Sequence, residues 1–250
     1  NRIKSLIPQA LVVTILTGII LAILLGINYD NVSHFLYGDI NAMTYTFSEN
    51  YFTIRLYGLP LGLLIALFFG IFRGFQNTYW AMYISVIGGL SNIFLDYILV
   101  LGVDNFISPM GVKGAAWASV ISQILMTILC VIFYLSKTPF NFKIRYKLNP
   151  FFKEMILIFV NMFVRTMVLN FVFIISNRYA NSYGSNSLAA YTIGYNIWIF
   201  SAFFIDGYSN AGNALAGKYM GEKNNEKLKK LGNTLLKINI KIALALMTVY

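Results

Sequence analysis

Asn92 and Asp96 are the residues whose types and spacing best suit chemistry, because they place an amide and a carboxylate inside an apolar run. Residues four apart lie on one face of a helix, so the two side chains can reach one small cation or proton. A charge at the centre of a bilayer costs about 2.5–3.5 kcal/mol on insertion scales, so an acid here calls for a functional explanation. The alternative is a polar pair that joins helices through hydrogen bonds. We favour a binding site.

The chemistry of these two side chains leaves the bound ion open. Carboxylate and amide oxygens suit a hard cation, here Na⁺, which makes Asp96 and Asn92 candidate metal ligands. The carboxylate of Asp96 could instead take up H⁺. The residues predict a bound Na⁺ or H⁺ and no other cofactor.

The composition predicts a polytopic membrane protein. Of the 250 residues, 58% are hydrophobic and 11% are charged, which is too apolar for a soluble domain of this size. The net charge of +10 does not indicate nucleic acid, because Lys and Arg lie between the apolar runs rather than along one face. The single cysteine, Cys130, excludes disulfides and cysteine-based metal sites. Since the chain starts at Asn1 and ends at Tyr250 inside an apolar run, we expect a piece of a longer protein.

Seven apolar runs predict membrane-spanning helices and hence an all-α transmembrane bundle, since about 20 apolar residues cross a bilayer. They lie at about 6–27, 54–72, 79–101, 114–135, 155–176 and 188–206, and a seventh starts near 235. Lys and Arg are absent from 28–53 and 102–111 but present in the connectors after the second, fourth and sixth runs. The positive-inside rule therefore places those three connectors and the N-terminus in the cytoplasm.

Several segments resemble the multidrug and toxic compound extrusion (MATE) family. They are residues 55–60, 72–78, 88–96 and 111–119. Shorter pieces at 165–166, 188–191 and 206–207 are similar to the DNA-damage-inducible-type branch of that family. The resemblance implies a twelve-helix transporter of two lobes in the inner (plasma) membrane.

On that map the chain supplies helices three to nine. Residues 1–135 would be four helices of the N-terminal lobe, 136–153 a cytoplasmic linker, and 154–250 the first three helices of the C-terminal lobe. In the family, an Asn and an Asp on helix five form the first-lobe cation site, which the resemblance carries to Asn92 and Asp96. A helix-six hydroxyl completes that site and matches Ser119, whose alternative role is packing among alanines.

The second half carries further polar candidates. Arg165 lies about ten residues into its span, and Asp206 is the available acidic partner, either as a structural pair or as groups that re-pair when the lobe changes shape. Asn213 stands where the branch often has a glutamate, which weakens the case for a second-lobe proton site. Asn170 and Asn196 could line a polar cavity or hydrogen-bond between helices.

Aromatic residues within the spans could form an adaptable cavity for flat organic cations. The candidates are Tyr57, Tyr83 and Tyr195, with Tyr191, Trp198 and Phe200 of the same type; the alternative is that they face lipid or other helices.

The expected function is a Na⁺- or H⁺-coupled antiporter that exports amphipathic, cationic organic compounds by alternating access. Its expected partners are small organic substrates and the lipid bilayer, and we expect a monomer at full length. The alternative is a lipid-linked oligosaccharide flippase of the same architecture, which would need basic residues in its cavity, and the Arg residues near spans are few. A membrane enzyme is disfavoured because the chain has one His and one Cys.

Overall fold

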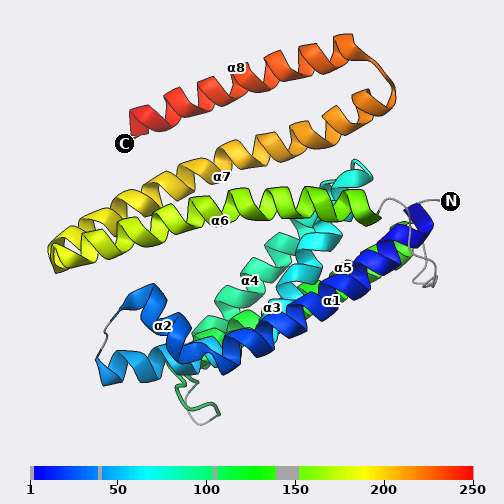
Figure 1. Cartoon of the computed structure of the whole chain (residues 1–250). Helices are drawn as coiled ribbons and strands as arrows, with labels where there is room; N and C mark the ends of the chain where they lie inside the picture. The colour runs from blue at the N-terminus through cyan, green and yellow to red at the C-terminus, as the bar shows by residue number, and fades with distance from the viewer. Residues whose placement is uncertain (1–2, 39–40, 104–105, 139–151, 250) are drawn as a thin grey trace. The chain divides into compact units, whose positions relative to one another are not determined.

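The computed structural model describes residues 3–38, 41–103, 106–138 and 152–249 (Figure 1). Its helices are α1 (Ile3–Ile27), α2 (Tyr29–Tyr37), α3 (Ala42–Gly74), α4 (Tyr79–Leu101), α5 (Val112–Lys137), α6 (Phe152–Ser182), α7 (Ser185–Gly221) and α8 (Asn225–Val249). In these residues the only β-type pairing is an isolated bridge between Val103 and Ile107. The predicted all-α class is confirmed.

Six helices of the described chain are long and apolar enough to cross a membrane, and they coincide with the first six predicted spans. They are α1 from Leu6, α3, α4, α5, α6 from Ile156, and α7. The seventh predicted span is helical as well, but α8 begins at Asn225, earlier than the predicted start near 235, and it is not one of the six. Lysines along α8, among them Lys237 and Lys241, lower its hydropathy.

The segment predicted as a connector, 28–53, is largely helical. It contains α2 and the first turns of α3, which has 33 residues and is longer than the hydrocarbon core needs. Tyr29 is buried, with its ring centroid 5.5 Å from that of Tyr45 and 5.1 Å from that of Phe52. The Tyr45 hydroxyl also donates a hydrogen bond to the carboxylate of Asp30. These contacts hold α2 against α3, and local sequence patterns do not reveal them.

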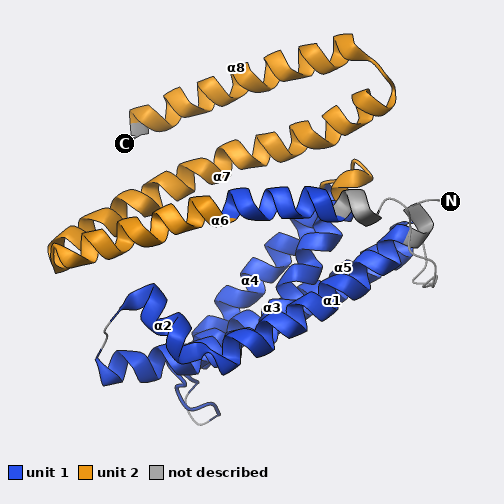
Figure 2. Cartoon of the chain, in the orientation of Figure 1, with its two compact units in different colours: residues 1–71, 79–166 blue, residues 72–78, 167–250 orange. Residues whose placement is uncertain are grey.

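The chain divides into two compact units (Figure 2). Unit 1 comprises Asn1–Ile71 and Tyr79–Thr166, and unit 2 comprises Phe72–Thr78 and Met167–Tyr250. The lobe boundaries expected from the family stay a prediction. Of the predicted linker, residues 139–151 lie outside the described part of the chain.

Close helix contacts organise unit 1. Gly18 of α1 lies against Pro60 of α3, where an added Cβ would stand 2.7 Å from the Pro60 Cα. On the α5 side of α3, Phe68 and Tyr134 are fully buried and their ring centroids are 5.7 Å apart. Helix α3 therefore contacts both α1 and α5. Small residues such as Gly18 permit this approach, which in lipid is driven by packing rather than by burial from water.

Unit 2 is a more open arrangement of α7, α8 and the C-terminal part of α6. Phe173 of α6 meets α7 through Tyr195 and Trp198, at ring-centroid distances of 5.3 and 5.2 Å. Gly212 of α7 is buried against Leu235 of α8. Most other side chains of these helices are exposed.

Candidate cation site

Helices α4 and α5 pack against each other in an antiparallel register that two glycines define. Gly88 of α4 lies against the side chain of Met126, and Gly114 of α5 lies against the backbone carbonyl of Leu99. At Gly114 only a residue without a Cβ allows this approach, because the neighbouring atoms belong to the backbone of Leu99. The two contacts place the middle of α4 opposite the middle of α5.

Asn92 and Asp96 lie on the side of α4 that faces α5. They follow Gly88 by four and eight positions, and Leu99 comes three positions after Asp96, so all four residues share one face of the helix. Gly88 and Leu99, which bracket the pair, both contact α5. Asn92 and Asp96 are half-buried, so the pair seen in the sequence projects into a helix interface.

Ser122 of α5 faces the same interface. It belongs to a row of positions four apart that begins at Gly114, passes through Ala118 and ends at Met126, and both end residues contact α4. The register set by those contacts brings Ser122 to the level of Asn92. Ser122 is only 4% exposed, so its hydroxyl is turned into the protein rather than toward lipid.

Three polar atoms at this interface are buried without a hydrogen-bond partner among the described residues: Asn92 Nδ2, Asp96 Oδ1 and Ser122 Oγ. A buried polar atom left unsatisfied costs about 1–3 kcal/mol, and more for a charged group. Such atoms are rare in folded proteins and call for a ligand, a water or a proton. The interface therefore has the chemistry of a binding site.

The side chains of this site fit either expected ion. The Asp96 carboxylate, the Ser122 hydroxyl and the Asn92 amide could each coordinate a cation through an oxygen atom. The Asn92 amide can do so because rotating it by 180° exchanges the positions of its oxygen and nitrogen. Protonation would instead turn the Asp96 carboxyl into a hydrogen-bond donor. Both events neutralise the buried charge.

Ser119, the hydroxyl expected from the family pattern, lies at the edge of the same face of α5. It precedes Ser122 by three positions and Met126 by seven, so it lies between the row that faces α4 and Gln123, which faces α3. Its exposure is intermediate. Ser122 was not among the residues predicted for the site, although the small residues at four-residue intervals, Gly114 and Ala118, mark the row to which it belongs.

Arg55 has a polar partner inside unit 1. Its Nη1 donates a hydrogen bond to Gln123 Oε1 at 3.5 Å, and the buried Gly58 leaves room for the Gln123 side chain. On the neighbouring turns, the rings of Tyr57 and Trp117 stack at 6.2 Å. Tyr57 thus contributes to the contact between α3 and α5 as well as to the surface.

The aromatic candidates of α7 gather around Tyr195. Besides the contacts of Phe173 with Tyr195 and Trp198, the Tyr195 ring stacks on that of Tyr191 at 6.1 Å. Phe200 instead pairs with Phe204. In unit 1, the ring of Tyr83 is 54% exposed. Unit 2 therefore holds an aromatic cluster formed by Phe173, Tyr191, Tyr195 and Trp198, and its role in a substrate cavity stays a prediction.

The polar candidates of the second half are exposed. They are Arg165 and Asn170 on α6, and Asn196, Asp206 and Asn213 on α7. Arg165 belongs to unit 1 and Asp206 to unit 2, so their pairing stays a prediction.

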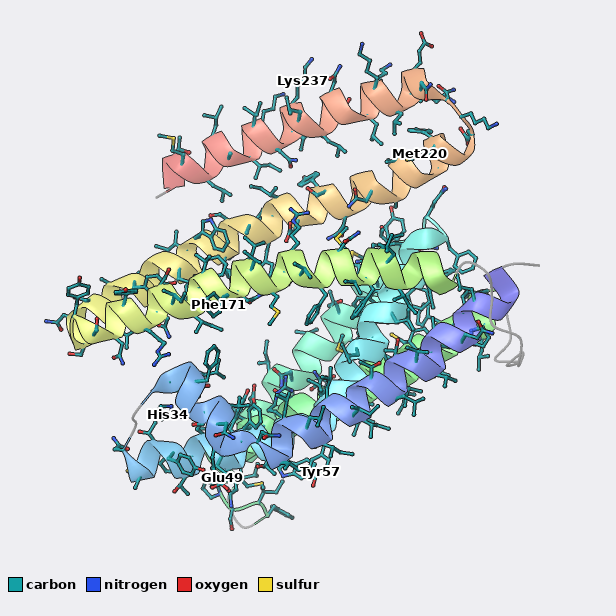
Figure 3. The ribbon with its side chains drawn as sticks, viewed as in Figure 1. His34, Glu49, Tyr57, Phe171, Met220 and Lys237 are labelled. Carbon is teal, nitrogen blue, oxygen red and sulfur yellow. The ribbon has the colours of Figure 1, made fainter. Side chains whose placement is uncertain are left out.

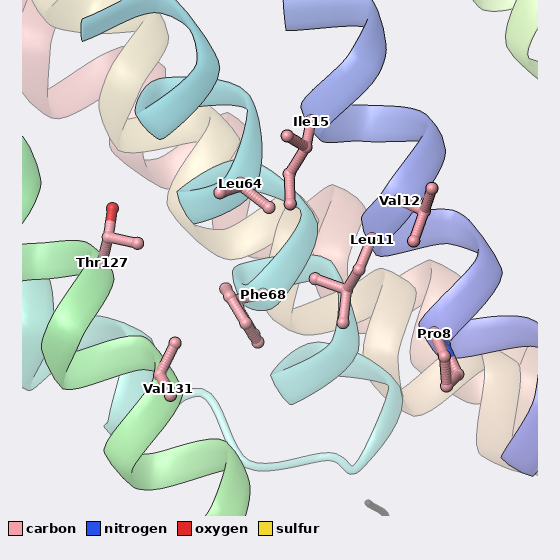
Figure 4. Close-up of a pocket in the computed structure, with 8 residues that line it drawn as sticks. All are labelled: Pro8, Leu11, Val12, Ile15, Leu64, Phe68, Thr127 and Val131. Atoms are coloured by element: carbon pink, nitrogen blue, oxygen red, sulfur yellow. The ribbon is translucent and has the colours of Figure 1, made fainter. Parts of the chain in front are cut away.

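A separate pocket of about 280 Å³ lies among α1, α3 and α5 (Figure 4). It is lined by Pro8, Leu11, Val12, Ile15, Leu64, Phe68, Thr127 and Val131. The Thr127 hydroxyl donates a hydrogen bond to the backbone carbonyl of Gln123 at 2.8 Å, so the pocket presents little polar chemistry. None of its residues comes from α4, and the pocket is distinct from the cation site.

Comparison with protein families finds a match over most of the chain. The sequence model of the MatE family matches residues 1–98 and 162–250, together well over half of the sequence. The chain belongs to the MatE family. The predicted MATE membership is confirmed, whereas the DNA-damage-inducible-type branch stays a prediction.

Relatives of this MatE chain occur in plants and bacteria. "Protein DETOXIFICATION 42" of Arabidopsis thaliana is 29% identical over 207 residues, which cover 80% of this chain and 37% of that protein. "Probable multidrug resistance protein NorM" of Thermotoga maritima is 28% identical over 232 residues, covering 90% of this chain and 48% of that protein. The chain thus spans about a third to a half of the length of these curated relatives.

Solved structures share the MatE fold. A MOP superfamily transporter from Pyrococcus furiosus matches with a TM-score of 0.83 at 21% identity, covering 97% of this chain and 53% of that one. An outward-facing multidrug resistance MATE transporter matches with a TM-score of 0.79 at 21% identity, over 98% of this chain and 54% of that one. At these identities the likeness shows the fold alone, that of a multi-pass membrane transporter.

Proposed function

We propose that the protein to which this chain belongs is an antiporter in which Na⁺ or H⁺ binds at Asp96, with Asn92 and Ser122, and drives the export of organic compounds. The observation that carries this proposal is the buried Asp96 Oδ1, which has no hydrogen-bond partner in the described residues. Membership of a family of transporters points to transport rather than catalysis. Ion coupling is the role that an acid in a membrane helix most readily serves.

The proposed mechanism follows from the charge of Asp96. With Asp96 ionised and unpaired, the α4–α5 interface carries a desolvated charge, which disfavours the arrangement that excludes water from it. Binding of Na⁺ or H⁺ neutralises the carboxylate and gives a partner to the buried Asp96 Oδ1, which otherwise has no hydrogen bond. The ion therefore shifts the population of transporter states by its differential affinity for them, which is the requirement for alternating access.

The proposed substrates are amphipathic, cationic organic compounds. Relatives from Thermotoga maritima and Staphylococcus aureus bear the names multidrug resistance protein and multidrug export protein. The cluster formed by Phe173, Tyr191, Tyr195 and Trp198 supports this class, because aromatic faces attract organic cations.

The test is efflux of a fluorescent organic cation from proteoliposomes that contain the full-length protein. We expect Asp96→Asn to abolish efflux, because an amide can neither hold a proton nor supply a carboxylate to Na⁺, while the protein still folds and inserts. Glu49→Gln is the matched control, since it makes the same chemical change at an exposed acid of α3. Normal efflux by the Asp96→Asn variant would overturn the proposal.

The coupling ion is identified in the same vesicles by imposing either a Na⁺ gradient or a pH gradient alone. Only the gradient of the coupling ion is expected to drive efflux by the unmodified protein, and neither is expected to drive it in Asp96→Asn. An unmodified protein that exports no organic cation, in cells where its deletion blocks turnover of a lipid-linked sugar precursor, would instead support the flippase alternative.

A further inference from the structure

The hairpin of α7 and α8 fixes which side of α8 faces its neighbour. Asn224, in the short turn, caps α8 by accepting a hydrogen bond from the Lys227 backbone N–H at 3.0 Å. The Lys227 ammonium lies 5.9 Å from the ring centroid of Tyr219. Further along, Gly212 packs against Leu235. These contacts tie the two helices together over several turns.

Half-buried residues mark the face of α8 toward α7. They recur at intervals of three or four, as one face of a helix requires, and they are Leu228, Leu231, Leu235, Ile238, Asn239, Ile242 and Leu246. Leu235, which contacts Gly212, belongs to this row. The remaining side chains of α8 therefore point away from α7.

A row of lysines runs along the side of α8 turned away from α7. Lys230, Lys237 and Lys241 are spaced by seven and four residues, which aligns them on the helix surface, and all three are exposed (Figure 3 labels Lys237). The only acidic residue of α8, Glu226, is confined to its first turn. Beyond that turn, no acidic residue of α8 balances the positive charge of the lysine row.

Exposed apolar residues run beside the lysines. Leu236, Ile240 and Leu244 are 63%, 51% and 58% exposed and follow one another at intervals of four. They lie next to the lysine row on the same outward side of the helix. A surface with cations along one edge and apolar side chains along the other complements an amphiphile that has a negative head and an apolar tail.

The direction of the side chains brings the lysines to the depth of lipid headgroups. Side chains of a helix lean toward its N-terminus, and long lysine stems lie along apolar surface while the ammonium reaches toward the interface. The N-terminal end of α8 is the lysine-rich end, which the positive-inside rule places at the cytoplasmic surface. A lysine left in hydrocarbon would be costly, so a headgroup phosphate is a favourable partner.

We propose that this outward side of α8 binds an anionic phospholipid, with the headgroup phosphate held by Lys237 and Lys241 and an acyl chain along Leu236, Ile240 and Leu244. Neutral phospholipids lack the net negative charge that the lysine row complements. The site is independent of the transported substrate and of the ion bound at Asp96.

The test measures the affinity of fluorescent phosphatidylglycerol and phosphatidylcholine for the full-length protein in a neutral detergent. We expect the Lys237→Gln, Lys241→Gln double variant to bind phosphatidylglycerol about 30-fold more weakly, as expected for two lysines near a headgroup. The double variant Lys223→Gln, Lys229→Gln is the matched control, because it removes the same charge outside the row and is expected to change the affinity by less than about threefold. Phosphatidylcholine binding should be equal in all three proteins.

Three results would overturn this proposal. The first is unchanged phosphatidylglycerol binding by the Lys237→Gln, Lys241→Gln variant. The second is an equal loss in the control variant, which would indicate diffuse attraction by the basic connector. The third is displacement of the labelled lipid by glycerol 1-phosphate as readily as by unlabelled phosphatidylglycerol, which would indicate a site for a soluble anion.

Discussion

At Asp96 the helix pair α4–α5 leaves a carboxylate oxygen without a hydrogen-bond donor, and the same holds for the neighbouring groups of Asn92 and Ser122. A protein that needed these residues only to join two helices would pair the amide with the carboxylate or the hydroxyl, since each unmet bond costs about 1–3 kcal/mol. The unmet bonds are therefore better explained by a ligand than by packing.

The two serines of α5 differ in burial, because Ser122 is 4% exposed and Ser119 is half-buried at the edge of the row that faces α4. We predict that Ser122→Ala lowers ion-driven efflux by about tenfold, because losing one oxygen ligand or hydrogen bond of about 1–1.5 kcal/mol weakens ion binding by that factor. Ser119→Ala is expected to have a smaller effect, and Ser136→Ala, at an exposed position near the end of α5, none. Efflux from proteoliposomes is the measurement; a larger loss at Ser119 than at Ser122 would favour Ser119, the hydroxyl that the family pattern implies.

At the scale of elements, glycines set the distance between α4 and α5. Gly88 faces the flexible side chain of Met126, which can move aside, whereas Gly114 faces the backbone of Leu99, which cannot. The two glycines therefore differ in their tolerance of a side chain, although both lie in helices.

Gly114→Ala is predicted to destabilise the protein by about 1–3 kcal/mol, because the new Cβ would overlap the Leu99 carbonyl and push the helices apart. Gly89→Ala is the matched control. No atom outside its own helix lies within 4 Å of a Cβ at position 89, so the higher helix propensity of alanine should leave stability unchanged or raise it by up to about 1 kcal/mol. Thermal unfolding of the detergent-purified proteins measures both effects; equal midpoints would show that the contact tolerates a methyl group.

At the scale of the whole molecule, the proposals depend on the orientation of the helices in the membrane. The headgroup site on α8 and the direction of ion entry both depend on which connectors face the cytoplasm. The six apolar helices support a multi-pass protein, and the alternation of Lys and Arg between connectors supports the orientation.

We predict that a membrane-impermeant maleimide labels His34→Cys in intact cells but labels Lys229→Cys only after the membrane is permeabilised. His34 lies on α2, in the segment without Lys or Arg, and Lys229 lies in the basic region at the start of α8; both are exposed. The native Cys130 is fully buried, so it should contribute little background. Labelling of Lys229→Cys in intact cells would show that the start of α8 faces outward. The basis for a cytoplasmic headgroup site would then be lost.

The sequence alone determined the six long apolar helices and the placement of Asn92 and Asp96 on one face of α4. An apolar run long enough to cross a bilayer predicts a membrane-spanning helix, because a helix forms its backbone hydrogen bonds within its own segment. The length and hydropathy of that segment can be taken directly from the sequence. The spacing of Asn92 and Asp96 sufficed to place them on one face for the same reason. The family resemblance, carried by short motifs, was sufficient for MATE membership.

Only the tertiary structure decided which faces meet. It turned Ser122 toward α4, held the 28–53 segment as α2 and the first turns of α3 through the contacts of Tyr29, and showed that the lysines of α8 lie on its outward side. Each of these outcomes depends on contacts between residues distant in sequence, such as that of Gly114 with Leu99, and the sequence of one helix does not show which face of another helix it contacts. The candidate ion site, predicted as a pair of residues on one helix, lies at the interface between α4 and α5.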